Sequence, residues 1–176
     1  SHVEVNGKVL GVVGAGTIGR EVIKVAQALG MKVLAYTRTP RADEDNLKYV
    51  SLEELLKQSY YISLHCPLTP QTRHMINKET IAMMKPTAYI INTGRGALID
   101  EPALIEALKE GRIAGAGLDV QETGQPVQDN PLYDNPNVIL TPHMGWKGLE
   151  TRQRLVSILA ANIQAFDEGR PQNVVS

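Results

Sequence analysis

The sequence predicts an α/β fold, a doubly wound parallel sheet with helices on both faces. Short apolar runs rich in β-branched residues alternate along the chain with segments that have the apolar period of a helix. Several helical segments carry start or stop signals, and a glycine-rich stretch separates the first apolar run from the first helix. Together these observations indicate strands and helices that alternate in one layered domain.

Strands are predicted at the apolar runs that are too short for helices. The first, "KVLGVV", covers residues 8–13, and the second, "KVLAYT", covers residues 32–37. Each is rich in valine or in other residues that favour strands. The remaining strands are predicted at 60–65, 87–93, 113–120 and 137–142.

Helices are predicted where apolar residues recur at helical spacing, and the first two carry clear boundary signals. Gly30 ends the first helix, and Ser51 begins the second with Glu54 three residues later in capping-box position. The predicted helices are 17–30, 51–59, 77–84, 101–111 and about 149–167.

Proline and glycine bound the later helices. Pro86 stops the third helix, whereas Pro102 lies in the first turn of the fourth and Gly111 lies beyond its end. Residues 122–137 are rich in turn formers and are predicted to form one long loop before the last strand.

Composition limits the classes of protein to which the chain can belong. Its 176 residues, 43% hydrophobic and 21% charged, suit one domain, and we expect a single dinucleotide-binding domain over residues 1–176. The formal net charge of -1 gives no indication of a nucleic-acid or membrane partner. With one cysteine, Cys66, and no apolar leader or membrane-spanning run, we expect a cytoplasmic protein.

The glycine-rich stretch Gly14-Ala15-Gly16-Thr17-Ile18-Gly19 has the spacing of a dinucleotide-binding turn. Gly14 can supply the tight turn, Gly16 lets the backbone approach a pyrophosphate, and Gly19 allows the helix to pack closely. The first amides of the helix, with Thr17 and Ile18, would then point at the phosphates. Because the motif lies between a predicted strand and a predicted helix, we interpret the fold as Rossmann-type.

The end of the second predicted strand bears on which dinucleotide binds. An NAD site usually has an acidic residue there for the ribose 2′-hydroxyl, but this chain has Thr37, Arg38 and Thr39, followed by Arg41. These side chains could hold a 2′-phosphate, so we favour NADP over NAD. Alternatively, the arginines are solvated loop residues, or Arg38 stacks on adenine.

Arg95 is an always-charged residue at the end of the buried run 87–93, with Gly94 and Gly96 on either side. Such an arginine is either a structural ion-pair partner or a group that meets an anion. The residues themselves leave both alternatives open.

Four motifs resemble the nucleotide-binding domain of the D-isomer-specific 2-hydroxyacid dehydrogenases, in that family's order. They are "GVVGAGTIGREV", "SLHCPLTPQTRHMIN", "MKPTAYIINTGRGALIDEPALIEALKEGRIAGAGLDV" and "NPNVILTPHMGW". Among subgroups, the chain is most similar to glycerate and hydroxypyruvate dehydrogenases. The resemblance implies hydride transfer between NAD(P)H and a small 2-oxo or 2-hydroxy acid. A non-catalytic, dinucleotide-sensing module of the corepressor type is the alternative.

The resemblance also implies roles for single residues. Arg95 would bind the substrate carboxylate, and His143 would donate or accept the proton at the 2-oxygen. Asp119 would bond the nicotinamide carboxamide and ribose. The other cofactor contacts are expected at Pro67, Thr72, Thr93, Gly94 and Gly145.

Two departures from the family pattern qualify this hypothesis. The family's histidine-holding glutamate corresponds to Gly124, and neither Glu122 nor Gln125 occupies that position. Family enzymes also have a substrate domain, which we expect to be absent from this chain. We further expect no metal site, because His65, Cys66 and His74 lack zinc-ligand spacing, and we expect a two-fold homodimer.

Overall fold

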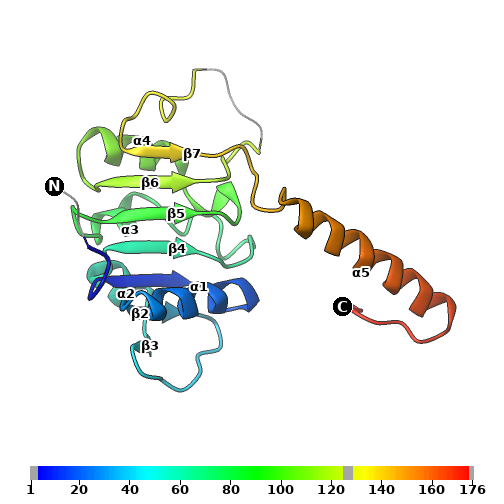
Figure 1. Cartoon of the computed structure of the whole chain (residues 1–176). Coiled ribbons are helices and arrows are strands. Elements are labelled where there is room, and N and C mark those ends of the chain that lie inside the picture. The colour runs from blue at the N-terminus through cyan, green and yellow to red at the C-terminus, as the bar shows by residue number, and fades with distance from the viewer. Residues whose placement is uncertain (1–3, 125–128, 175–176) are drawn as a thin grey trace. The chain divides into compact units, whose positions relative to one another are not determined.

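The computed structural model describes residues 4–124 and 129–174, which include a seven-stranded parallel sheet. The strand order is β3-β2-β1-β4-β5-β6-β7, and every neighbouring pair is parallel (Figure 1). The strands are β1 Val9–Val13, β2 Lys32–Tyr36, β3 Leu47–Tyr49, β4 Tyr61–Leu64, β5 Tyr89–Asn92, β6 Gly115–Leu118 and β7 Val138–Leu140.

The predicted helices are present; the first four are shorter than the sequence patterns suggested, and the last has the predicted bounds. They are α1 Thr17–Ala28, α2 Leu52–Gln58, α3 Lys78–Ala82, α4 Glu101–Lys109 and α5 Leu149–Asp167. The side chain of Ser51 accepts a hydrogen bond from the Glu54 amide, as the capping pattern predicted. Asn77 and Asp100 cap α3 and α4 in the same way.

The chain divides into two compact units, Ser1–Pro142 and His143–Ser176. The first contains the sheet with α1 to α4, and the second contains α5. The expectation of one domain over residues 1–176 stays a prediction. No helix in the described ranges is long and apolar enough to cross a membrane.

Apolar residues on both faces of the sheet form the core of the first unit, because successive strand residues point to opposite faces. Val13 packs with buried residues of α2, α3 and α4, whereas the preceding Val12 packs with Ile23 and Ala26 of α1. Helices therefore cover both faces, and the predicted fold class is confirmed.

The short strand β3 is an element that the sequence patterns did not predict. It has three residues, of which only Leu47 is buried, so it lacks the alternation that identifies a strand. Backbone bonds of its flanking residues to β2 hold it at the sheet edge: the Val33 amide donates to the Asn46 carbonyl at 2.7 Å, and the Val50 amide donates to the Ala35 carbonyl at 3.0 Å. Tertiary pairing, rather than local preference, determines this strand.

Candidate functional site

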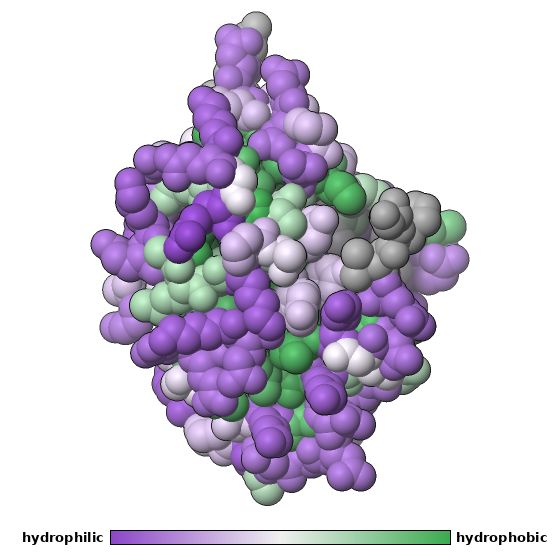
Figure 2. All heavy atoms as spheres, turned by 90° about the vertical axis from the view of Figure 1, so that its left-hand side faces the viewer, coloured by the Kyte–Doolittle hydropathy of each residue, from purple (hydrophilic) through white to green (hydrophobic). Residues whose placement is uncertain are grey.

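The carboxyl ends of the parallel strands place the predicted site residues of the first unit along one edge of the sheet. The chain turns at Gly14 after β1, at Thr93 after β5 and at Asp119 after β6. The strand order reverses between β1 and β4, which is where open α/β sheets bind their ligands. The opposite edge, at the amino ends of the strands, is largely hydrophilic around smaller apolar patches (Figure 2).

Backbone contacts explain two glycines of the turn after β1. Gly14 has a φ of +100°, and a Cβ atom there would lie 2.6 Å from the Cys66 amide nitrogen. A Cβ atom on Gly19 would lie 2.0 Å from the Gly14 carbonyl oxygen, so α1 can begin this close to the turn only with glycine. Both roles match the sequence prediction for Gly14 and Gly19.

Gly16 differs from these two glycines because a Cβ atom there would meet no atom within 4 Å. The residue is the N-cap of α1 and provides no side-chain cap, and Gly16, Thr17 and Ile18 are exposed. The first amides of α1 therefore face an accessible surface, where an anion can accept their hydrogen bonds. The geometry fits a diphosphate that approaches the Gly16 backbone.

The turn after β2 presents two arginines at the surface. Arg38, Thr39 and Arg41 are exposed, and Thr37 is half-buried. Among the described residues, neither arginine has a recorded ion pair, although three acidic residues follow at 43–45. Asp43 accepts the Tyr49 amide at 2.9 Å.

A buried side chain fixes the turn that carries Arg95. Asn92 is 0% exposed; its Nδ2 donates to the Arg95 carbonyl at 2.9 Å, and its Oδ1 accepts from the Gly94 amide at 3.0 Å. The Arg95 guanidinium is exposed and donates to the Gly94 carbonyl at 2.8 Å. No carboxylate partner of Arg95 is recorded in residues 4–124 and 129–174, so the ion-pair alternative gains no support.

Sequence patterns did not identify Asn92 as part of the site. The signal available was an amide side chain at the end of an apolar strand, directly before a threonine and a glycine. The Asn92 carbonyl also accepts the Asp119 amide at 3.0 Å. Asn92 thus connects the Arg95 turn to Asp119.

The glycines that flank Arg95 play unequal roles. A Cβ atom on Gly96 would lie 1.9 Å from the Gln121 carbonyl oxygen, whereas one on Gly94 would make ordinary contacts of 3.5 Å or more. Gly96 is therefore required by the segment that follows Asp119. The space at Gly94 would accept a small side chain unless a ligand fills it.

Asp119 is nearly buried, with 7% of its surface exposed. Its Oδ1 accepts from the Thr141 hydroxyl at 2.5 Å, which joins the end of β6 to the residue after β7. In the loop after β4, the Thr72 hydroxyl donates to the Pro67 carbonyl at 2.7 Å. Thr72 therefore holds the exposed Pro67 in place, and Thr93 is exposed at the same sheet edge.

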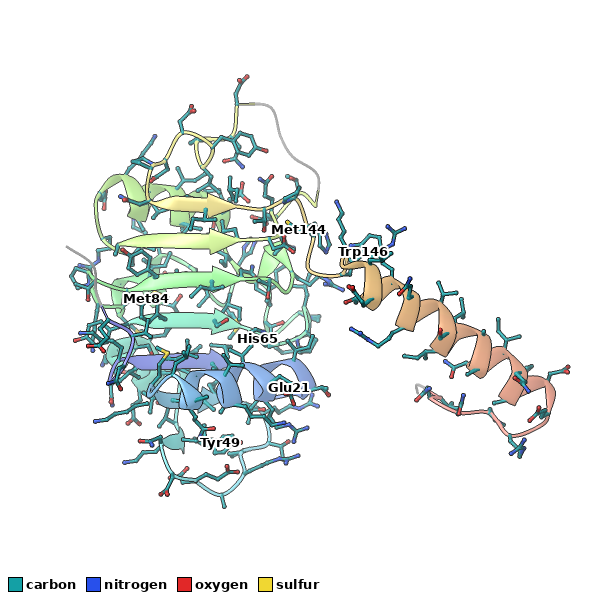
Figure 3. All side chains as sticks on the ribbon, in the orientation of Figure 1. Glu21, Tyr49, His65, Met84, Met144 and Trp146 are labelled. Atoms are coloured by element: carbon teal, nitrogen blue, oxygen red, sulfur yellow. The ribbon has the colours of Figure 1, made fainter. Side chains whose placement is uncertain are left out.

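His65 and Ser63 form a polar pair at the carboxyl end of β4, where Figure 3 labels His65. The Ser63 hydroxyl and His65 Nε2 lie 2.8 Å apart. Burial lowers the pKa of His65 and raises the pKa of the neighbouring Cys66 thiol. The described residues contain no group of three or more potential metal ligands.

His143 and Gly145 lie in the second unit, so the structure describes them apart from Arg95. His143 has a φ of 50°, a left-handed conformation that is uncommon for a residue with a side chain. Such strain occurs often at functional positions.

Gly124 occupies the position of the family glutamate in the segment after Asp119. Gly124 has a φ of +70°, a conformation that disfavours a side chain although the space around it is open. Glu122 points elsewhere, since its carboxylate accepts from His74 at 2.6 Å and from Arg73 at 3.1 Å. Gln125 lies outside the described residues.

The model for the NAD-binding domain of the D-isomer-specific 2-hydroxyacid dehydrogenases matches residues 1–145. The chain belongs to this family. The matched range includes the glycine-rich turn, Arg95, Asp119 and His143, so the resemblance drawn from the motifs is confirmed.

Individual members of the family are similar over nearly the whole chain. The hydroxypyruvate reductase of Blautia hydrogenotrophica is 48% identical over 176 residues, 99% of this chain and 55% of that protein. The structure of D-lactate dehydrogenase with NAD⁺ from Lactobacillus jensenii has a TM-score of 0.91 at 36% identity, covering 99% of this chain and 57% of that one.

A second solved structure is an acyclic imino acid reductase in complex with NADPH and D-Arg. It has a TM-score of 0.90 at 38% identity and covers 99% of this chain and 55% of that one. The chain thus spans about half the length of the family members it matches. Because these proteins are reductases and dehydrogenases, the corepressor-type alternative gains no support from them.

Proposed function

We propose that this chain is the dinucleotide-binding part of an oxidoreductase that acts on a small 2-oxo or 2-hydroxy acid. The position of Arg95 is the observation that supports this proposal. Its exposed guanidinium lies at the carboxyl edge of the sheet, in a turn fixed by buried Asn92. A planar guanidinium can pair with both oxygens of a carboxylate, which fixes the neighbouring 2-carbon.

The turn after β1 fits the diphosphate of a dinucleotide. Gly14 and Gly19 set its shape, Gly16 leaves space for close approach, and the amides at Thr17 and Ile18 begin α1. Asp119, Thr93, Gly94, Pro67 and Thr72 would line the remaining cleft in the first unit. The bound nicotinamide would supply the hydride in the reductive direction.

His143 is proposed to give the proton to the 2-oxygen during reduction and to take it back during oxidation. An imidazole suits this step because its ordinary pKa lies near neutral pH. Gly145, two residues after His143, is proposed as a cofactor contact.

For the cofactor, we infer a preference for NADPH over NADH. Arg38 and Arg41 are exposed without a recorded ion pair in the described ranges, beside the hydroxyls of Thr37 and Thr39. Similar folds hold NADPH in one solved structure and NAD⁺ in another. We also propose that the protein forms a two-fold homodimer. Its proposed location is the cytoplasm.

Calorimetry with Arg38→Ala tests the cofactor preference. NADPH should bind the parent chain more tightly than NADH, and the substitution should weaken NADPH binding by about tenfold or more, the effect of one charge-assisted hydrogen bond. Lys48→Ala, on the nearby strand β3, is the control and should change neither affinity. Equal affinities of the parent chain for NADH and NADPH would contradict the preference.

The activity itself is tested by assaying the full-length protein with glyoxylate, hydroxypyruvate and related oxo acids. The proposal expects oxo-acid-dependent oxidation of NADPH or NADH and a loss of kcat by about 10²- to 10⁴-fold in His143→Ala. Absence of turnover with every oxo acid, despite dinucleotide binding, would overturn it.

A further inference from the structure

Glu122 lies close to three segments that carry expected site residues: the loop with Thr72, the segment after Asp119 and the turn with Arg95. Its Oε1 accepts from His74 Nε2 at 2.6 Å and from Arg73 at 3.1 Å, and 22% of its side chain is exposed. Both partners belong to the loop that contains Thr72. The carboxylate therefore ties the segment after Asp119 to the loop after β4.

A second set of bonds joins Glu122 to the start of α4. The Glu122 amide donates to Glu101 Oε2 at 3.1 Å, and the Glu101 amide donates to Glu122 Oε2 at 3.4 Å. Glu101 Oε1 also accepts from the Asn130 side chain at 2.8 Å. Hydrogen bonds thus hold both the backbone amide and the side-chain carboxylate of Glu122.

The peptide between Gln121 and Glu122 lies directly against the turn that carries Arg95. A Cβ atom on Gly96 would lie 1.9 Å from the Gln121 carbonyl oxygen and 2.5 Å from the Glu122 amide nitrogen. The His74 amide donates to the Ala97 carbonyl at 2.8 Å, so the partner of Glu122 also holds the residues after Gly96. The Glu122 segment and His74 therefore contact Gly96 and Ala97, the residues that follow Arg95.

We propose that Glu122 is a positioning residue for carboxylate recognition, acting through the backbone that follows Arg95. This inference rests on the proposed function. Under this proposal Glu122 does not hold His143. In the family that role belongs to a glutamate at the position that Gly124 occupies here. Glu122 fixes the guanidinium that meets the substrate, with His74 as its main partner.

The first test measures the Arg95 turn directly by hydrogen exchange of the full chain. Glu122→Ala should speed amide exchange in residues 93–98 by about fivefold, as expected from the loss of one hydrogen bond. Glu106→Ala, which removes the exposed Lys78–Glu106 pair between α3 and α4, is the matched control and should leave these amides unchanged. Unchanged exchange in Glu122→Ala would overturn the inference whether or not the protein is active.

The second test is a double-mutant cycle on kcat/KM for the best oxo acid, using the full-length protein. Glu122→Ala alone should lower kcat/KM by about tenfold, mainly through KM, because even a misplacement of about 1 Å is costly. In an Arg95→Ala background the same substitution should change kcat/KM by less than about twofold, since the residue it positions is gone. Glu122→Gln, which can still hydrogen-bond His74, should recover part of the loss.

Additive losses in the cycle would show a general structural role and overturn the inference. If the parent protein turns over no oxo acid while hydrogen exchange still responds to Glu122→Ala, the proposed function fails and the positioning contact stands. The two failures are therefore distinguishable.

Discussion

Two turns at the same edge of the sheet are fixed by different sets of contacts. The turn after β1 is set by missing side chains, because Cβ atoms on Gly14 and Gly19 would overlap neighbouring backbone. The turn after β5 also needs one glycine, Gly96, but it is held in addition by side chains, chiefly Asn92 and, through the segment packed on Gly96, Glu122. The first turn presents the backbone amides at the start of α1 to a ligand, whereas the second presents a charged side chain.

The largest loss of stability in the turn after β1 is expected at Gly19. In Gly19→Ala the new methyl would meet the Gly14 carbonyl at 2.0 Å, so the start of α1 must shift. We expect a loss of about 3 kcal/mol or more in the free energy of unfolding, measured in urea, and loss of dinucleotide binding.

Gly16→Ala separates packing from ligand binding in that turn. Its methyl would enter open space, so stability should change by about 1 kcal/mol or less, while dinucleotide affinity falls because the methyl occupies the phosphate approach. A Gly16→Ala protein that binds the dinucleotide as the parent does would show that the phosphates lie elsewhere.

In the second turn, the corresponding change is Asn92→Ala. It leaves the Gly94 amide and the Arg95 carbonyl without their buried partner, and we expect a loss of about 2 kcal/mol in the free energy of unfolding. Ser59→Ala is the control: the Ser59 hydroxyl is equally buried but has no partner among the described residues, so its removal should cost nothing or stabilise. Equal losses in the two variants would contradict a specific role for Asn92.

The smallest expected effect is the pH dependence contributed by His65, which lies between the two turns. Burial lowers its folded-state pKa, so the unfolded chain binds the proton more readily. This contribution to stability is complete above the unfolded pKa of about 6.5 and declines as the pH falls through the folded value. Urea unfolding at pH 7 and pH 5 should therefore show less pH dependence in His65→Gln than in the parent, and identical dependence would refute the contribution.

The same contrast explains what the sequence could predict. The glycine turn was visible in the sequence because its spacing is local, and the helix cap at Ser51 follows from the neighbouring Glu54. Arg95 and Asp119 were found through motifs. Asn92 and Glu122 were missed as parts of the site because their roles depend on packing, and Glu122 and His74 are 48 positions apart. Likewise, β3 exists only through its pairing with β2.

Arg95 is proposed to recognise the carboxylate of a 2-oxo acid. This role is tested most directly by the kcat/KM of Arg95→Ala in the full-length protein, with the dinucleotide affinity measured alongside. The control is Arg112→Ala, because Arg112 also donates to a backbone carbonyl, that of Ala82, but lies away from the Arg95 turn. We predict a fall of about 10²-fold in Arg95→Ala through a higher KM and a lower kcat, with unchanged dinucleotide affinity and a normal Arg112→Ala. Near-parental kcat/KM in Arg95→Ala would show that Arg95 does not bind the substrate carboxylate.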